Sequence, residues 1–109
     1  MGGEVQQTTG LAELILVRPN GERLAVTVAI GHPFPTSAQD WACPVSFAPL
    51  HEGTTAIHGQ DSFQAICLAI AFVKDLLTSF LADGGQILYA ATGEQFPIDA
   101  YFASRGARA

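Results

Sequence analysis

Three side chains whose types suit metal binding or nucleophilic chemistry lie in the middle of the chain: Cys43, His51 and His58. Thiolate and imidazole groups are ligands that zinc and softer metals prefer in proteins. Their spacing, C-x7-H-x6-H, matches no standard zinc pattern, because those patterns bring ligands together in closely spaced pairs. We therefore predict no metal and no cofactor, and regard these three residues as the candidates if a metal site exists.

A nucleophilic site would use Cys43 or Ser62 together with a histidine and Asp61. Neither nucleophile lies in a G-x-S-x-G elbow or a known cysteine-enzyme signature. Ser62 is explained as the first residue of a helix, and Cys43 falls on the inward face of its strand by alternation. Because triads assemble from residues distant in sequence, a small hydrolase or metal enzyme using Cys43, His51 or His58 stays an alternative, with no catalytic residue assigned.

Acid–base catalysis by paired carboxylates and phosphate binding find no support in the sequence. The carboxylates are scattered over turns and helix ends, positions that their local hydrogen bonding favours. The Gly84-Gly85 pair follows a helix, whereas a phosphate-binding helix presents the amides of its N-terminus. Asp61 stands at the N-terminus of the helix that these glycines follow, and its carboxylate would repel a phosphate. We therefore predict no nucleotide site.

Composition predicts one small globular domain. The chain has 109 residues, of which 49% are hydrophobic and 14% charged, which is far from a disordered composition. We expect a flexible tail over 1–10, one α+β domain over 11–100 and a C-terminal tail over 101–109. The net charge of −5, with only five basic residues, argues against nucleic-acid binding.

The sequence also gives expectations about the location of the protein in the cell and about the state of its cysteines. The N-terminus lacks the basic and apolar regions of a secretory signal, and Lys74 and Asp75 interrupt the most apolar stretch, 65–73. We therefore expect a cytoplasmic protein that does not bind membranes. Cys43 and Cys67 are expected to be reduced and buried, and a disulfide between them stays an open alternative.

Hydrophobic alternation predicts the strands. A hairpin is expected over 12–30, where Asn20-Gly21 favours a type I′ turn. The prolines near His32 predict a loop over 31–40. Residues 41–47 alternate as a third strand, which must be an edge strand or bulged because Pro44 cannot donate to a ladder. Two shorter strands are expected at 54–58 and 86–90.

A long helix is predicted over 62–82. Asp61 is its expected N-cap, Gln64 stands at the capping-box position, and Asp83 with the glycines after it ends the helix. The apolar coat is wider than one sheet face requires. The residues expected to face the sheet form one stripe: Phe63, Ile66, Ile70, Val73, Leu77 and Phe80.

Two motifs carry a family resemblance. Asp40-Trp41-Ala42-Cys43 precedes a segment that runs from Gly59 through Asp61 and Gln64 to Ala69. This order resembles a family of small bacterial proteins known as a domain of unknown function, with a D-W-x-C strand before a G-x-D-x-x-Q-A-L-x-L-A helix. The resemblance covers about 18–98, with Ile66 in place of leucine. It implies a fold and a bacterial source but no activity.

We interpret these motif residues as structural. Trp41 is expected to anchor the core between sheet and helix, Gly59 to permit a tight turn, and Asp61 with Gln64 to start the helix. The predicted architecture is a two-layer α+β fold, β-β-β-(β)-α-β-(β), in which one long helix packs across an antiparallel sheet of four to five strands.

Three functions are carried forward from the sequence. The first is a non-enzymatic interaction or binding domain whose partner is another protein or a second copy, for example an immunity-type protein or a homodimer; it rests on surplus apolar surface. The second is the hydrolase or metal enzyme described above. The third is a small-ligand carrier with a pocket between sheet and helix lined by Trp41 and Phe47.

Overall fold

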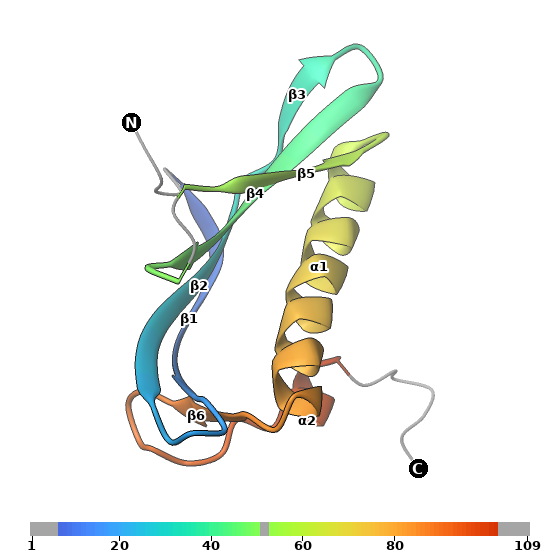
Figure 1. Ribbon diagram of the computed structural model, residues 1–109. Helices are drawn as coiled ribbons and strands as arrows, with labels where there is room; N and C mark the ends of the chain where they lie inside the picture. Colours follow the sequence, from blue (N-terminus) through green and yellow to red (C-terminus); the bar gives the residue numbers. More distant parts are fainter. Residues whose placement is uncertain (1–6, 51–52, 103–109) are drawn as a thin grey trace.

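A computed structural model describes residues 7–50 and 53–102 and confirms the predicted α+β architecture. One open antiparallel sheet carries a long helix on one face (Figure 1). The sheet has six strands rather than four or five, because part of the expected loop over 31–40 is itself a strand. The elements are β1 (Thr8–Val17), β2 (Arg23–Gly31), β3 (Phe34–Ser37), β4 (Asp40–Ala48), β5 (Thr55–Gly59), α1 (Ser62–Ala82), β6 (Gln86–Tyr89) and α2 (Ile98–Phe102).

The sheet is built around β4 and the β1–β2 hairpin. One edge of β4 pairs with β5. The other edge pairs with β2 near one end of the strand and with β3 near the other end. β5 must lie on the opposite edge from these two strands, because some β4 residues pair with β5 and with β2 or β3 at the same time. On the far side β2 pairs with β1, and β1 with β6. β1 begins at Thr8, so residues 8–10 belong to the sheet rather than to the expected tail.

The β1–β2 hairpin is confirmed, but its turn is not the predicted type I′ turn. The amide of Gly21 donates to the carbonyl of Arg18 at 2.8 Å, and the Arg18 amide donates to the Glu22 carbonyl at 2.8 Å. Gly21 has a φ of 92°, whereas Asn20 has a negative φ. This pattern is a type I turn followed by a glycine bulge, and Pro19 favours it because its ring holds φ negative at the first central position.

Pro44 lies within a strand that has partners on both sides, so the edge-strand alternative is wrong. β4 itself is not bulged at Pro44, where its register with β5 is unbroken, and the irregularity lies in the partner on the other side. Ile30 pairs with Val45 and Phe34 with Ala42, so residues 31–33 face only residues 43–44 across the ladder. The extra residue stands on the β2–β3 side. This break in pairing falls beside Pro44, where a continuous ladder would require a donor that proline lacks.

α1 has the predicted bounds and the predicted N-terminal cap. The Gln64 amide donates to Asp61 Oδ1 at 2.8 Å, and the Gln64 side-chain oxygen accepts from the Gln60 amide at 2.6 Å. The carboxylate and amide side chains thus satisfy backbone donors that a helix start leaves unpaired. Asp83 is the C-cap, and Gly84 follows with a φ of 97°.

The predicted sheet-facing stripe of α1 is only partly correct. Val73 and Leu77 are buried as expected, but Phe63 is 76% exposed and Ile70 41% exposed. The most buried positions in the first half of the helix are two alanines, Ala65 and Ala69. Small side chains face the sheet there because the helix lies close to it: a Cβ on Gly59 would lie 2.5 Å from the Ala65 nitrogen.

α1 is also apolar on its exposed side. By length and composition alone it is a candidate for crossing a membrane, with a mean hydropathy of 1.9 over its most apolar stretch, although Lys74 and Asp75 stand within it. Only 22% of that stretch is buried. One face of the helix nevertheless packs on the sheet through Ala65, Ala69 and Val73. A core helix of a soluble domain passes the same length and composition test.

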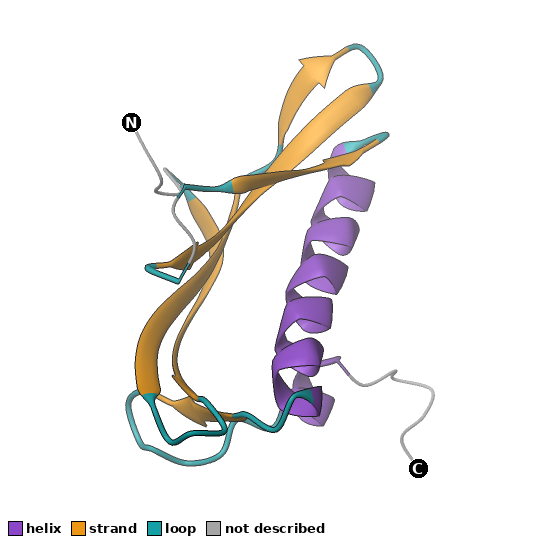
Figure 2. Cartoon of the chain, in the orientation of Figure 1, coloured by secondary structure: helices purple, strands orange, loops and turns teal. Residues whose placement is uncertain are grey.

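The helix rests on the sheet mainly at its two ends. Its first half packs against β4 and β5, and its C-terminal end lies near β6. Between these supports, β1 and β2 curve away from the helix, which Figure 2 shows as an arch of strands facing a straight helix. The core cluster follows the arch and includes Leu14, Val26, Val45 and Ile87. The arch leaves space between the layers, and that space contains the site described next.

Candidate functional site

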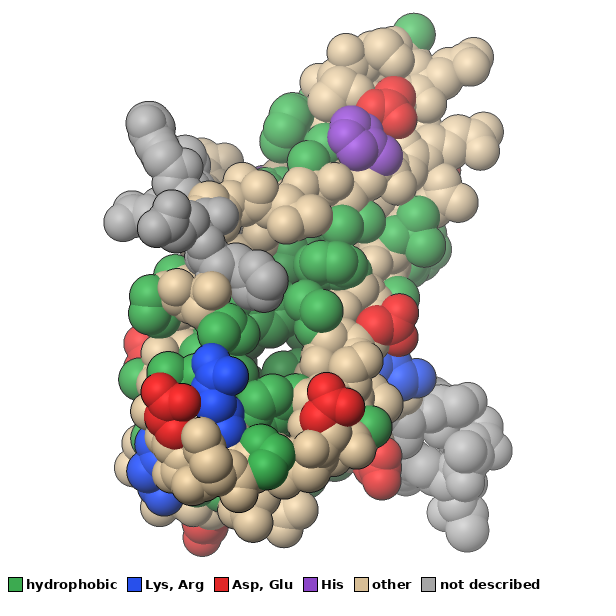
Figure 3. All heavy atoms as spheres, viewed as in Figure 1, with side chains coloured by type: hydrophobic (Ala, Val, Ile, Leu, Met, Phe, Trp, Pro, Cys, Tyr) green, Lys and Arg blue, Asp and Glu red, His purple; other side chains and the backbone are tan. Residues whose placement is uncertain are grey.

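A cleft of about 280 Å³ lies between the arched part of the sheet and α1. In the space-filling view, hydrophobic side chains gather between the two layers, and the surface is hollowed there (Figure 3). The cleft is open to solvent at Leu11, Ile70 and Tyr101, three lining residues that are 58%, 41% and 54% exposed. The cleft is therefore a preformed apolar concavity, the usual form of a small-molecule site.

The cleft has three kinds of wall. β1 and β2 form its floor, one flank of α1 forms a side, and the segment after β6 closes one end. The lining residues are Gly10, Leu11, Ala12, Leu14, Val28, Ile30, Ile70, Val73, Leu77, Phe96, Tyr101 and Phe102. None of these described side chains is charged, so they offer no counter-ion to a charged group inside the cleft.

The end wall is aromatic. The rings of Phe96 and Tyr101 have centroids 4.4 Å apart, and Tyr89 packs edge-on against Phe96 with centroids 5.5 Å apart. The hydroxyls of Tyr89 and Tyr101 lie 2.9 Å apart and share a hydrogen bond, which joins β6 to α2. That hydrogen bond raises the pKa of the Tyr89 phenol, with smaller contributions from burial and nearby charge.

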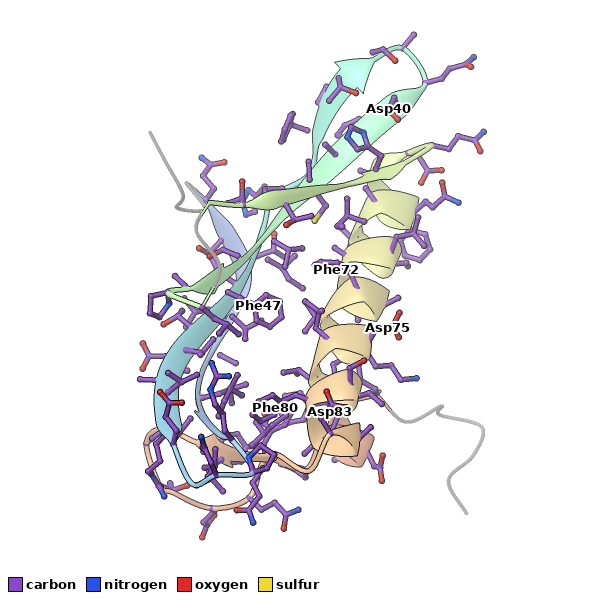
Figure 4. The ribbon with its side chains drawn as sticks, viewed as in Figure 1. Asp40, Phe47, Phe72, Asp75, Phe80 and Asp83 are labelled. Carbon is purple, nitrogen blue, oxygen red and sulfur yellow. The ribbon has the colours of Figure 1, made fainter. Side chains whose placement is uncertain are left out.

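The pocket predicted for a small-ligand carrier does lie between the sheet and the helix, but other residues than the predicted ones line it. Neither Trp41 nor Phe47 lines the cleft. Phe47 points from β4 into the space between sheet and helix, and Phe80 points into it from α1 (Figure 4). Trp41 is half-buried and packs against the core on the part of β4 that pairs with β5. Helix and sheet are closely packed there, so the free space opens further along the helix.

Cys43 and His58, the two candidate metal ligands among the described residues, are not brought together. Cys43 is fully buried on β4, and its thiol lies 3.4 Å from the carbonyl of Gly31. His58 lies on β5 opposite Ala42, whereas Cys43 lies opposite Ile57, so the Cys43 and His58 side chains project from opposite faces of the sheet. His51 lies outside the described residues. Burial raises the pKa of the Cys43 thiol, which disfavours the thiolate that metal binding or attack requires.

The cysteines agree with the sequence expectation except for the burial of Cys67. Both are free thiols, and Cys67 is exposed on α1 rather than buried. Cys43 belongs to the core cluster and Cys67 lies on the outer side of the helix. The open alternative of a disulfide between them is therefore not the pairing in this structure.

Asp40 forms a polar cluster that the sequence did not indicate. Its carboxylate accepts hydrogen bonds from the Thr36 hydroxyl and from His58 Nδ1, the latter at 2.7 Å. These two bonds, that from Thr36 first, lower the pKa of the Asp40 carboxyl. The cluster joins β3, β4 and β5, and about half of the His58 side chain is exposed. A carboxylate that orients a histidine is a feature of catalytic sites, but among the described residues no third side chain bonds to this histidine.

The remaining motif residues make packing and helix-capping contacts. Gly59 is buried against the first turn of α1, where a side chain would collide with the backbone of Ala65. Asp61 and Gln64 form the cap described above. Gly59 therefore allows close packing of α1 on β5 rather than a tight turn, and Asp61 with Gln64 starts the helix.

The sequence analysis missed the residues that line the cleft. Tyr101 was assigned to the C-terminal tail, but it lines the end wall together with Phe96, which is 5% exposed. An aromatic cluster over 96–102 was a visible signal. Its meaning depends on the contact between α2 and the sheet, which no local pattern predicts.

Comparison with known proteins identifies a family for the chain but no individual relative. A family model described as a domain of unknown function, DUF6968, matches residues 13–99. No curated protein matches the chain, and no solved structure matches it. The matched range runs from β1 into α2 and so includes the strands, the long helix and most of the cleft.

Proposed function

The chain belongs to the DUF6968 family, a domain of unknown function, and we propose that this member is a non-enzymatic protein that binds a small apolar ligand in the cleft between β1–β2 and α1. The observation that carries this proposal is the cleft itself. Apolar walls with few polar groups, contributed by both layers of the fold, are typical of ligand sites. Its volume of about 280 Å³ suits a small molecule, since a cavity of roughly 150 Å³ accepts benzene.

The position of the cleft supports binding without chemistry. Within the described part of the chain, the lining supplies one side-chain polar group, the Tyr101 hydroxyl, which already shares a hydrogen bond with Tyr89. Of the catalytic candidates, Cys43 lies on β4, His58 on β5 and Ser62 at the start of α1, and none of these three lines the cleft. His51 lies outside the described residues. Binding is therefore the function that the geometry of this cleft favours.

A methyl-detected NMR titration with decahydro-2-naphthol, an uncharged bicyclic probe, tests the proposal. We expect saturable shifts at the methyl groups of Val28, Val73 and Leu77, and none at the exposed Leu50. Val73→Phe should block binding because its ring would occupy the cleft. The matched control Ala71→Phe, on the exposed side of α1, should bind like the parent protein. Absence of saturable shifts at the lining methyls would refute the proposal.

A second function, self-association, is favoured by the exposed flank of α1. Phe63 and Ile70 are seven residues apart and so lie on the same side of the helix, and Phe63 is 76% exposed. An exposed large aromatic beside further apolar residues is typical of an interface. We propose that a second copy of the chain covers this flank.

Native mass spectrometry over a range of protein concentrations tests self-association. We expect a dimer mass for the parent protein and a monomer mass for Phe63→Glu, because burying the new carboxylate at the interface would be unfavourable. Phe34→Glu, at an exposed aromatic on β3, is the control and should remain dimeric. A monomer at every concentration would exclude this second function.

A further inference from the structure

We propose that the cleft selects uncharged ligands that carry an aromatic ring, and that the end wall formed by Phe96, Tyr101 and Phe102 determines this preference. The inference rests on the proposed binding function and adds the chemical class of the ligand. It follows from the charge of the lining, the arrangement of its aromatic rings and the volume of the cleft.

Charge is the first criterion. None of the described residues that line the cleft is an acid, a base or a histidine. An ion that leaves water for an apolar site needs a partner of opposite charge or several hydrogen-bond donors, and the lining side chains offer only the Tyr101 hydroxyl. The part of the ligand that enters the cleft must therefore be uncharged.

The distribution of aromatic rings is the second criterion. Aliphatic side chains of β1, β2 and α1 line the floor and the side, whereas the three aromatic lining residues stand together at one end. Phe96 and Tyr101 are tilted by 32° with ring centroids 4.4 Å apart, and Tyr101 and Phe102 lie 6.4 Å apart. A ligand ring at this end gains edge or offset contacts that a saturated ring of the same size lacks.

The hydrogen bond between Tyr89 and Tyr101 holds this wall in place. Tyr101 is half exposed and belongs to a helix of only five residues, so packing alone restrains it weakly. The bond to Tyr89 joins it to β6, which is itself paired with β1. An ordered ring at the mouth keeps the wall preorganised, so that the ligand does not have to order it on binding.

Three probes that share one carbon skeleton separate these criteria: 2-naphthol, decahydro-2-naphthol and 2-naphthoate. The first two are uncharged at neutral pH, and the third is an anion. Each is titrated into the full chain by methyl-detected NMR. We expect 2-naphthol to bind roughly two- to tenfold more tightly than its saturated counterpart. We expect 2-naphthoate to bind at least about tenfold more weakly than 2-naphthol.

Variants assign the preference to the end wall. Tyr101→Leu should bring the affinities of 2-naphthol and decahydro-2-naphthol closer together, whereas Tyr101→Phe, which keeps the ring, should retain most of the difference. Phe34→Leu, at the opposite end of the sheet, should retain it fully. Tyr101 is 54% exposed, so neither of its substitutions removes a core contact that folding requires.

The outcomes distinguish the inference from the proposed function. If decahydro-2-naphthol binds in the cleft as tightly as 2-naphthol, the aromatic preference is overturned and the binding function stands. If 2-naphthoate binds as tightly as 2-naphthol, selection against charge is overturned. If none of the three probes shifts the lining methyls, the binding function fails and the inference fails with it.

Discussion

Asp40 shows how a single residue can join three strands without forming an active site. Its carboxylate lies at the end of the sheet where β3, β4 and β5 meet, and it accepts hydrogen bonds from Thr36 and His58. Both bonds are to the charged form of the carboxyl group and therefore lower its pKa. His58 is held by its Nδ1 atom while much of the ring remains in solvent. We interpret the cluster as a tie between strands.

The pKa of Asp40 tests this interpretation. Thr36→Val removes the larger cause of the shift, so the pKa of the carboxyl should rise toward its usual value in carbon-detected NMR titrations. Because the folded pKa is lowered, the stability that these bonds contribute is fully present above the unfolded pKa and is lost as pH falls through the folded value. The acid limb of the stability curve should therefore be shallower in Thr36→Val. An unchanged Asp40 pKa would contradict the assignment.

The two thiols should differ sharply in reactivity. Cys67 is exposed on α1, whereas Cys43 is fully buried, and burial raises its pKa. Titration of the native protein with a thiol reagent should therefore modify one cysteine rapidly, and titration in denaturant should modify both. Cys67→Ser, as the control, should leave no fast-reacting thiol. Rapid labelling of Cys43 in that variant would contradict its burial.

At the scale of elements, one face of α1 packs closely on the sheet in the first half of the helix and borders an open cleft further along. Its first half presents Ala65 and Ala69, which are both completely buried and allow close approach to β4 and β5. Further along, Val73 and Leu77 face the cleft. The change from alanine to larger side chains follows the change from close packing to an open space.

Ala69→Leu should destabilise the protein. The larger side chain has no free volume where the helix meets the sheet, and overpacking of this kind costs about 1–3 kcal/mol. Urea unfolding followed by circular dichroism measures the loss. Ala71→Leu adds the same atoms on the exposed side of the helix and should change the free energy of unfolding by less than about 0.5 kcal/mol. Equal effects of the two substitutions would contradict the close packing at Ala69.

At the scale of the whole molecule, the cleft results from a straight helix that spans a curved sheet. α1 contacts β4 and β5 at one end and β6 at the other, and β1 and β2 arch between them (Figure 2). The cleft is therefore a property of the two layers together and of no single element. Its mouth continues into the exposed flank of α1 through Ile70, which lines the cleft and is 41% exposed.

Val73→Leu tests the presence of free space between the layers. The substitution enlarges a side chain on the same face as Ala69, one turn later, but toward the cleft of about 280 Å³. We expect a change in the free energy of unfolding of less than about 1 kcal/mol, because volume is available for the added carbon. Binding of decahydro-2-naphthol should weaken as that volume is filled. A loss of stability as large as that of Ala69→Leu would indicate a closed core at this position.

Local signals in the sequence predicted the elements well. The bounds of α1, its cap at Asp61 and Gln64, the β1–β2 hairpin and the two-layer fold are confirmed, because a cap, a turn and a hydrophobic period depend on residues near one another in the chain. The irregular strand pairing beside Pro44 was also expected, because proline lacks a backbone donor. The sequence did not show that the irregularity would lie in the partner of β4.

The site depended on contacts that the sequence does not contain. The sheet-facing side of α1 was misassigned at Phe63 and Ile70, because hydrophobicity ranks a phenylalanine above an alanine, whereas close packing against β4 and β5 selects the small residue. The cleft was expected at Trp41 and Phe47, but the curvature of β1 and β2 placed it elsewhere. The sequence by itself determined α1, the β1–β2 hairpin and the segments of β4, β5 and β6, but not β3 or α2. Only the tertiary structure decided where the two layers separate and which side chains, Tyr101 among them, face that space.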